Sequence, residues 1–244
     1  MTVHILKPDT TPMSVNRQAA IVGFTLRGDE VRLFGPDDAA DLPLDAASDI
    51  VVGGVGIVRA ALPRMGLPVP SLPTIPEALR PFAGRTIWQA PMREARQAVE
   101  RGEALFVKPC ADQPKLFDGR ALITFKDLIA TAAVPDDMIV ECATLTPFVS
   151  EYRVFVIGPE IIGVRPYKGD LLTFPDPATV RAAREAFTDA PAAYALDLGV
   201  CEDGVTRLVE VTDAYATAAY GLSPARYAAF IAARWEEWRA TPDA

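Results

Sequence analysis

Two acidic residues, Asp197 and Glu210, stand in a stretch of sequence whose spacing would bring them face to face. The segment LDLGVCEDGVTRLVEVTD, residues 196–213, has the pattern of a β-hairpin that turns at Asp203-Gly204. Counting back from a two-residue turn pairs Asp197 with Glu210, with Cβ atoms about 5 Å apart. The same count makes two further pairs, Val200 with Arg207 and Leu198 with Val209. Like charges directly opposite destabilise a sheet, so the sequence needs a reason to place them there.

The other face of this hairpin is apolar. Alternation with a period of two gives that face Leu196, Leu198, Val209 and Val211, which we expect to be buried. The two carboxylates then share the opposite face. They are either solvated side chains of a surface hairpin or ligands that a fixed hairpin presents.

The remaining residue types narrow the chemistry that the chain could perform. It has 244 residues, a formal net charge of −8, one histidine and three cysteines. His4 lies in the strand-like VHIL and is expected to be an ordinary strand residue, which leaves Ser-His-Asp, Cys-His and zinc sites without ligands. The acidic charge argues against broad nucleic-acid or anionic-membrane binding. Chemistry on hard cations and phosphates, which uses Asp, Glu, Lys and Arg, remains.

The compartment is expected to be the cytoplasm. The three cysteines are scattered and odd in number, which suits a reducing environment and no disulfide framework. The sequence shows no signal peptide, and no apolar run approaches the roughly 20 residues needed to span a bilayer.

Two nucleotide-binding motifs can be tested against the sequence. The chain has no G-x-x-x-x-G-K-[ST] sequence, so it is not of the P-loop class. The segment DIVVGGVGIVRAAL has a G-x-G that starts at Gly54, but its third glycine position holds Arg59. This is a weak dinucleotide signal, more typical of a plain strand-to-helix turn. An unrelated α/β enzyme that uses the Gly53–Gly56 turn for a dinucleotide stays as one alternative.

Other charged residues stand on or at the ends of predicted strands: Lys108, Glu141, Glu151, Arg153, Arg165 and Lys168. Each could be an ordinary residue of a solvated strand, and Glu151 with Arg153 could be a simple surface ion pair. Their order along the chain, taken together with Asp197 and Glu210, is harder to dismiss.

The elements that would carry these residues fall into three parts. Residues 1–84 alternate strand-like and helix-like pieces, which predicts an α/β domain with a small parallel sheet, and an uncharged linker runs from Met65 to Pro76. Residues 85–143 predict a small subdomain with the helix APMREARQAVERG and the strands ALFVKP, ALITF and MIVEC. Residues 144–244 predict a strand pair, a helix, the hairpin and an amphipathic helix at the C-terminus.

This order of motifs resembles the ATP-grasp superfamily, whose members hold ATP between two α+β subdomains. The resemblance covers roughly residues 85–222 and is closest to the divergent clade in which a lysine replaces the usual arginine. The matching pieces are FVKPCADQPKLFDGR, MIVEC, EYRVFVIG, YALDLGV and LVEVTDAYATAAYGL. The resemblance implies a mixed α/β and α+β chain, in which an N-terminal α/β (pre-ATP-grasp) domain precedes the ATP-grasp fold.

The resemblance also implies roles for individual residues. Asp197 and Glu210 stand where the family places an aspartate and the glutamate of an E-x-N motif, and they would hold Mg²⁺, with Mn²⁺ as a second candidate. This would explain the opposed carboxylates, because Mg²⁺ is usually bound by one or two carboxylates plus phosphates. The nucleotide residues would be Lys108 at the phosphates, Glu141 and Cys142 at the adenine, Glu151 at the ribose, and Lys115 in a lid loop from Cys110 to Arg120. Arg153 would stabilise the transferred phosphate or an acyl phosphate.

Two positions depart from the family pattern. The asparagine of E-x-N is Thr212, so a hydroxyl would replace one neutral oxygen ligand of the metal. The arginine that many members carry two residues before the aspartate is Ala195, and Lys168 with Arg165 would supply the missing positive charge. Lysine cannot make the bidentate fork of arginine, which puts catalysis more in question than nucleotide binding.

The function implied is an ATP-dependent carboxylate–amine ligase that forms an acyl phosphate and releases ADP and phosphate. Its substrate would be a small molecule, an amino acid or a peptide. The main alternative is a non-catalytic nucleotide-binding or interaction protein on the same scaffold. A homodimer is expected only from the frequency of homodimers among soluble proteins.

Overall fold

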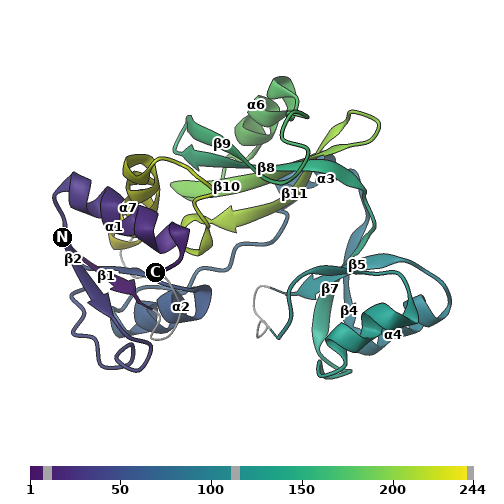
Figure 1. Cartoon of the computed structure of the whole chain (residues 1–244), viewed down its shortest axis with the longest axis horizontal. Helices are drawn as coiled ribbons and strands as arrows, with labels where there is room; N and C mark the ends of the chain where they lie inside the picture. The colour runs from purple at the N-terminus through teal and green to yellow at the C-terminus, as the bar shows by residue number, and fades with distance from the viewer. Residues whose placement is uncertain (8–12, 111–115, 241–244) are drawn as a thin grey trace.

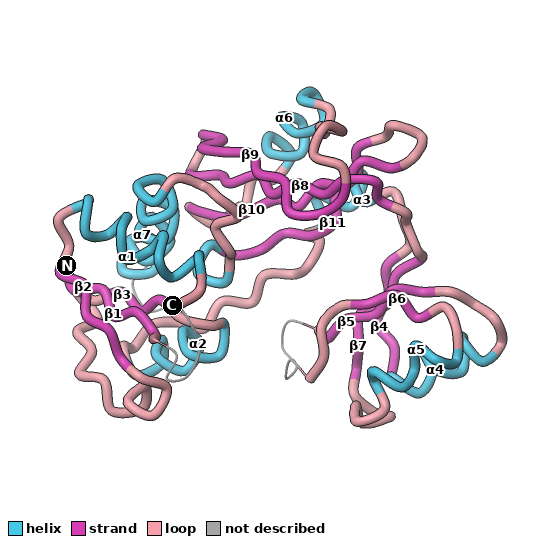
Figure 2. Tube along the Cα trace, viewed as in Figure 1, coloured by secondary structure: helices cyan, strands magenta, loops and turns pink. Residues whose placement is uncertain are grey.

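The structure is a computed structural model that describes residues 1–7, 13–110 and 116–240. The described strands form three sheets, with the orders β2-β1-β3, β4-β7-β5-β6 and β11-β10-β8-β9. Figure 1 shows the sheet that contains β5 and β7 set apart from the rest of the molecule, and Figure 2 shows the chain that connects the parts. Among the described helices, none has the length and apolarity needed to cross a bilayer.

The N-terminal sheet is parallel. Its elements are β1 (Thr2–Leu6), α1 (Val15–Arg27), β2 (Glu30–Phe34), β3 (Ile50–Val52) and α2 (Val55–Arg64). Strand β1 pairs in parallel with both β2 and β3, which confirms the predicted small parallel sheet. The apolar runs of β1 and β3 are almost fully buried, as is usual for parallel strands covered by helices.

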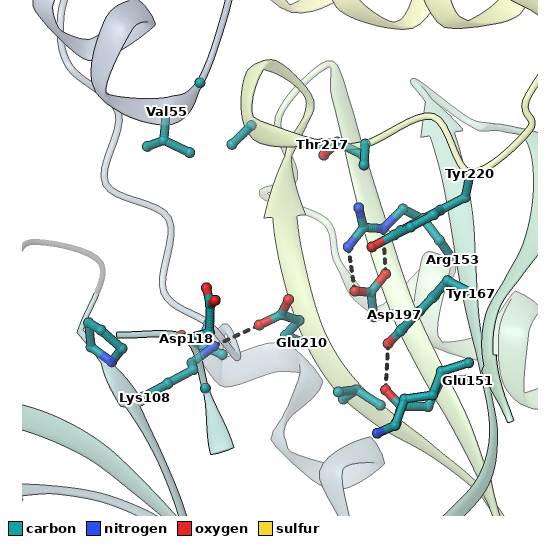
Figure 3. Close-up of a pocket in the computed structure, with 18 of the residues that line it drawn as sticks. Val55, Lys108, Asp118, Glu151, Arg153, Tyr167, Asp197, Glu210, Thr217 and Tyr220 are labelled. Carbon is teal, nitrogen blue, oxygen red and sulfur yellow. Dashed lines mark hydrogen bonds and ion pairs between the residues drawn. The ribbon is translucent and has the colours of Figure 1, made fainter. Parts of the chain in front are cut away.

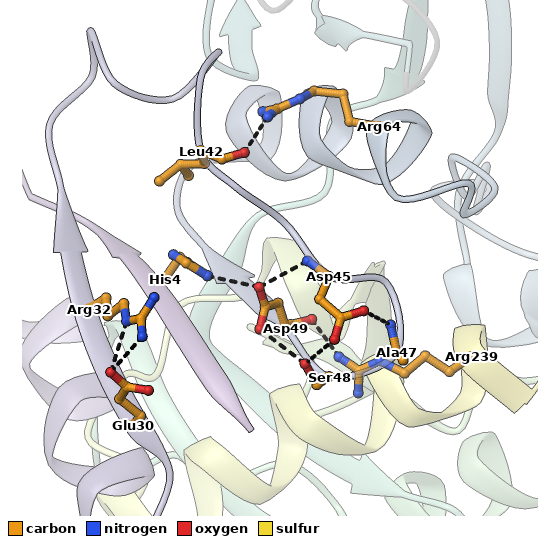
Figure 4. A network of polar contacts seen from close by, with 10 residues as sticks. All are labelled: His4, Glu30, Arg32, Leu42, Asp45, Ala47, Ser48, Asp49, Arg64 and Arg239. Atoms are coloured by element: carbon orange, nitrogen blue, oxygen red, sulfur yellow. Dashed lines mark hydrogen bonds and ion pairs between the residues drawn. The ribbon is translucent and has the colours of Figure 1, made fainter.

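His4 belongs to the structure of this sheet. Its Nε2 lies 3.1 Å from Oδ2 of Asp49, and the same carboxylate oxygen accepts a hydrogen bond from the backbone N–H of Asp45 at 3.0 Å. Figure 4 shows this network between β1 and the loop that leads into β3. The single histidine is 2% exposed and holds a loop in place.

The small sheet carries its helices on one face (Figure 1). Its elements are β4 (Ile87–Pro91), α4 (Met92–Glu100), β5 (Leu105–Pro109), β6 (Arg120–Leu122), α5 (Phe125–Leu128), η2 (Ile129–Thr131) and β7 (Ile139–Thr144). Met92 and Val99 of α4 pack on Val107 and Val140 of the sheet in one apolar core. The sequence did not predict β4, whose residues do not alternate clearly, because TIWQAP runs directly into the helix.

The large sheet is antiparallel and holds most of the predicted site. Its elements are β8 (Phe148–Ile157), β9 (Glu160–Gly169), α6 (Pro177–Ala186), β10 (Ala193–Cys201), β11 (Thr206–Asp213), η3 (Ala214–Ala216) and α7 (Pro224–Ala240). One face packs with α6, where Val180 and Ala183 join the apolar residues of β8, β10 and β11.

Packing crosses two of the predicted domain boundaries. Helix α7, at the end of the 144–244 range, shares a core with α1 and the N-terminal sheet. The segment with η1 (Glu77–Leu79) and α3 (Arg80–Ala83), which the sequence places in the N-terminal domain, buries Leu79 against the large sheet. The backbone N–H of Val211 also donates to the carbonyl of Thr74 at 2.8 Å.

The α1–α7 contact depends on Gly23. A Cβ at this position would lie 2.0 Å from the carbonyl oxygen of Pro224, at the start of α7. We therefore expect Gly23→Ala to lower the free energy of unfolding by about 1–3 kcal/mol through overpacking, despite the higher helix propensity of alanine. Chemical denaturation would measure this. Gly56→Ala, in α2 with open space around the glycine, is the matched control and should leave stability unchanged or slightly higher.

Candidate functional site

A cavity of about 1480 Å³ lies where the three sheets meet. Its lining includes these predicted site residues: Lys108, Glu141, Glu151, Arg153, Lys168, Asp197 and Glu210. Figure 3 shows most of them converging from opposite walls. Lys108 and Glu141 come from the small sheet, and the others come from the large sheet.

The hairpin pairs Asp197 with Glu210 as predicted, but its turn is different. The N–H of Gly204 donates to the Cys201 carbonyl at 2.9 Å, and the N–H of Cys201 donates to the Val205 carbonyl at 3.0 Å. Gly204 has φ of 78°, so the loop has three residues and ends in a left-handed glycine. The predicted two-residue turn is wrong.

A bulge cancels the effect of this longer loop. Val200 pairs with Thr206 and Leu198 with Leu208, so the predicted pairs Val200–Arg207 and Leu198–Val209 are also wrong. The register then shifts between Leu198 and Asp197, where Val209 is the extra residue of β11. Leu208 takes the predicted place of Val209 in the buried core.

Asp197 belongs to a row of charged residues that crosses all four strands of the large sheet. The register aligns Glu210 with Asp197, Asp197 with Arg153, and Arg153 with Arg165. Arg153 donates to Asp197 through Nε at 2.7 Å and through Nη2 at 2.6 Å, and both residues are buried. Burial raises the pKa of Asp197 to about 6, against the opposing effect of Arg153. The bidentate pair therefore compensates a buried carboxylate.

Glu210 is neutralised from the other wall of the cavity. The ammonium of Lys108, on β5 of the small sheet, lies 2.7 Å from Oε2 of Glu210 and 3.7 Å from Oε1 of Glu141. Burial alone would raise the pKa of Glu210, but the charge of Lys108 lowers it below its usual value. Each opposed carboxylate of the hairpin thus has its own basic partner. The Lys108–Glu210 pair bridges the two sheets.

Glu151 organises the neighbouring part of the wall. It accepts a hydrogen bond from the hydroxyl of Tyr167 at 2.7 Å and forms an ion pair with Lys168. Glu151 pairs with Lys168 and Tyr152 pairs with Pro166, so Tyr167 is the extra residue of a second bulge. Bulges next to a site redirect side chains, and this one lets Tyr167 and Lys168 both face the cavity.

Tyr220 is a lining residue that sequence reasoning missed. Its ring stacks on that of Tyr167, with centroids 5.1 Å apart, and the guanidinium of Arg153 lies 4.9 Å from its ring centre. Its φ of 43° is unusual for a residue with a side chain. The Tyr-Gly step in AAYGL, just after the hairpin, was the available signal.

Arg85 was also missed. It lines the cavity and donates to the carbonyls of Leu208 and Val209, the two residues at the hairpin bulge. Burial lowers its pKa. It joins the entry of the small subdomain to the strand that carries Glu210, a contact no local pattern encodes.

The other predicted site residues lie elsewhere. Arg165, Cys142 and Thr212 do not line the cavity in the described part of the chain. Cys142 is buried in the core of the small subdomain, where burial raises the pKa of its thiol to about 11. Lys115 lies outside the described residues, although Gly119 and Arg120 of the same loop line the cavity.

Asp213, the alternative to Thr212 as an oxygen ligand, is committed to another contact. Arg234 of α7 donates to Asp213 through Nη2 at 2.9 Å, and both side chains are buried. Asp213 is also absent from the described cavity lining, as expected from alternation along β11.

Comparison with known proteins identifies the family. A model of the ATP-grasp domain, family 2 of the arginine-to-lysine clade, matches residues 82–230. The chain belongs to this family. The match contains Lys108, Arg153, Asp197 and Glu210, and it confirms the resemblance seen in the sequence. No curated protein sequence matches the chain significantly.

Solved structures show that the ATP-grasp fold extends over nearly the whole chain. The RimK domain ATP-grasp protein from Sphaerobacter thermophilus has 18% identity and a TM-score of 0.56, over 95% of this chain and 100% of that chain. The D-alanine–D-alanine ligase from Bacillus anthracis, solved with ATP, has 14% identity and a TM-score of 0.58, over 100% and 99%. The ATP-grasp ligase PsnB, solved with a minimal precursor, Mg and ADP, has 15% identity and a TM-score of 0.50, over 96% and 97%. The predicted fold class is confirmed.

The donor set of the ATP-grasp site suits a hard cation that shares its ligands with a substrate. Among the described residues no group of three or more His, Cys, Asp or Glu side chains could hold a metal ion alone. Asp197 and Glu210 supply two facing carboxylates at the cavity wall. Mg²⁺ is commonly bound in this way, through one or two carboxylates with phosphate oxygens and water completing the shell.

Proposed function

We propose that the chain is an ATP-dependent carboxylate–amine ligase of the ATP-grasp family. The observation that carries this proposal is the charge arrangement between the two sheets. Asp197 and Glu210 face the cavity from one sheet, and Lys108 reaches Glu210 from the other, so carboxylates for a divalent cation and an ammonium for phosphates are already opposed.

The residues divide into three roles in this proposal. Lys108 binds the phosphates of ATP, while Glu141 and the backbone around Cys142 meet the adenine. Asp197 and Glu210 hold Mg²⁺, which supplies neutralisation of phosphate charge when it is bound. Thr212 lies on the same strand, paired with Ala195, and it stays a weaker candidate for a metal ligand.

Arg153 is proposed to act on the reacting groups from a fixed position. Its bidentate contact with Asp197 and its place over the ring of Tyr220 hold the guanidinium against the cavity. Lys168 and Arg165 supply further positive charge, and Glu151, proposed to face the ribose, restrains Lys168. A preorganised cation of this kind stabilises charge that develops in a transition state.

The proposed reaction has two steps. A carboxylate oxygen of the acid substrate attacks the γ-phosphorus of ATP, the bond to the ADP oxygen breaks, and an acyl phosphate forms. An amine then attacks the acyl carbon, phosphate leaves, and the amine nitrogen loses a proton to give an amide. The chain supplies positioning and charge neutralisation, without a covalent nucleophile.

The nucleotide part of the proposal predicts a metal-dependent affinity for ATP. We expect the native chain to bind ATP in calorimetry and to bind it more tightly with Mg²⁺. Glu210→Gln should remove most of this difference, about tenfold or more in Kd, because one of two carboxylate ligands is lost. Glu210 is a better probe than Asp197, since its side chain is 34% exposed and its loss leaves no cation deeply buried.

The matched control is Glu100→Gln, an exposed glutamate at the end of α4. It should leave the magnesium dependence unchanged. A native chain that binds no ATP, or binds it equally with and without Mg²⁺, would contradict the proposal. ADP release that depends on an added carboxylic acid then separates a ligase from a non-catalytic nucleotide-binding protein, the alternative raised by Thr212 and Ala195.

A further inference from the structure

The cavity is larger than one ligand requires. Its volume of about 1480 Å³ exceeds the roughly 300–1,000 Å³ of ordinary small-molecule sites. Figure 3 places Lys108 and Glu151 at the bottom of the view, Val55 and Thr217 at the top, and Glu210 and Asp197 between them. If the nucleotide lies beside Lys108 and Glu151, as in the proposed function, the region near Val55 and Thr217 is left for the acid substrate.

This region, which we call the N-terminal end of the cavity, is defined by the walls that enclose it. One wall consists of Ser14, Asn16, Arg17, Arg59 and residues 51–56 of the N-terminal domain, and residues 215–218 after the hairpin form the other. The Gly53–Gly56 turn noted in the sequence is therefore part of the ATP-grasp cavity.

The charges of the lining divide along the cavity. The acidic lining residues in the described chain all belong to the small and large sheets or to the loop before β6: Asp118, Glu141, Glu151, Asp197 and Glu210. The N-terminal end has two arginines, Arg17 and Arg59, and no acidic residue among the described positions that line it. In a chain with a net charge of −8, this local excess of positive charge favours an anionic ligand.

Contacts between the two walls hold the arginines in place. Ala219 donates its backbone N–H to Oδ1 of Asn16 at 3.0 Å, next to Arg17 in the first turn of α1. Tyr215, whose ring packs against Trp238 at 5.6 Å, has a raised pKa because of burial and the charge of Asp213, and a hydrogen bond with Arg59 opposes this rise. The walls belong to different sheets, yet they meet through fixed side chains.

We infer that the acid substrate is a dicarboxylate, one carboxylate reacting beside Asp197 and Glu210 and the second binding Arg17 and Arg59. The inference rests on the proposed function for the first carboxylate only. A guanidinium presents a planar fork that matches a carboxylate, and Arg17 with Arg59 offers two such forks on one wall. A substrate with a single carboxylate would make no use of these two forks.

Binding of matched acids tests the inference. Dicarboxylic acids from succinate to pimelate, each compared with its own monomethyl ester, would be titrated into the native chain by calorimetry. The titrations would be made with and without Mg²⁺ and a non-hydrolysable ATP analogue. We expect at least one diacid to bind roughly ten- to a hundredfold more tightly than its monoester. Arg17→Gln and Arg59→Gln should each bring this ratio close to one.

Three further variants separate recognition from structural damage. Arg32→Gln changes an exposed arginine of β2 that lies outside the cavity, and it should leave the ratio unchanged. Tyr215→Phe removes the hydroxyl beside Arg59 but keeps both charges, so it should preserve most of the preference for diacids. Arg17→Lys, which keeps the charge without the fork, should give an intermediate ratio.

The outcomes distinguish this inference from the proposed function. Diacids that bind no better than their monoesters, or a preference that survives both glutamine variants, would overturn the inference while magnesium-dependent ATP binding still stands. A phosphate monoester that binds more tightly than every diacid, with the same dependence on Arg17 and Arg59, would overturn the dicarboxylate assignment. If the native chain fails to bind the nucleotide, the proposed function fails, and the titrations without nucleotide still decide whether the arginines bind diacids.

Discussion

Arg153→Met is expected to lower the free energy of unfolding by about 3–5 kcal/mol. Asp197 is 2% exposed and has the bidentate guanidinium as its partner, so the substitution would leave a buried carboxylate without compensation. Urea denaturation, with the slope against denaturant unchanged, would measure the loss as a lower midpoint. The same variant would lose the cation beside Tyr220, so its activity cannot be interpreted until its stability is known.

A second variant shows whether the loss comes from the unpaired carboxylate. Arg153→Met combined with Asp197→Leu replaces the pair by apolar side chains and should recover most of the stability, because a buried ion pair itself contributes little net free energy. Arg80→Met is the exposed control, since Arg80 and Glu77 are 69% and 83% exposed, and it should change stability by less than about 1 kcal/mol. A loss for Arg153→Met no larger than that of the control would contradict the description of the site.

Lys108→Met is expected to weaken binding of Mg-ATP roughly 10- to 150-fold, equivalent to about 1.5–3 kcal/mol for a hydrogen bond to a charged group. Two effects act together. The phosphates lose their ammonium partner, and Glu210, 2.7 Å from Nζ in the native chain, becomes an uncompensated anion beside them. Calorimetric titration with Mg-ATP would measure the change in Kd.

The double variant Lys108→Met with Glu210→Gln separates these effects. It removes the unpaired anion, so ATP measured without metal should bind more tightly to it than to Lys108→Met alone. Lys126→Met, an exposed lysine of α5, is the matched control and should bind as the native chain does. Native-like affinity in Lys108→Met would mean that the nucleotide phosphates lie elsewhere in the cavity.

The part of the site that could be predicted from sequence is the part encoded by local alternation. Asp197 and Glu210 face each other because short strands with apolar residues at every second position have one buried face. Glu151 and Arg153 share a face for the same reason. The parallel N-terminal sheet and the hairpin also followed from the order and character of the segments.

The remaining features depend on contacts between distant segments or on irregular backbone. The bulges at Val209 and Tyr167 each add one residue to a strand, and no regular pattern places such an insertion. The Lys108–Glu210 pair joins residues 102 positions apart on different sheets. Arg165 alternates correctly to share a face with Arg153, yet it lies on the edge strand β9 and does not reach the cavity in the described chain.

The Lys108–Glu210 ion pair also makes nucleotide and metal thermodynamically linked. In the ligand-free protein each of these residues is the counter-ion of the other. A cation bound at Glu210 releases the ammonium for phosphate, and phosphate bound at Lys108 releases the carboxylate for the cation. Each ligand therefore removes the competitor of the other, which adds a favourable coupling free energy to the direct attraction between metal and phosphate. Because such coupling is reciprocal, ATP must raise the affinity for Mg²⁺ by the same factor by which Mg²⁺ raises the affinity for ATP.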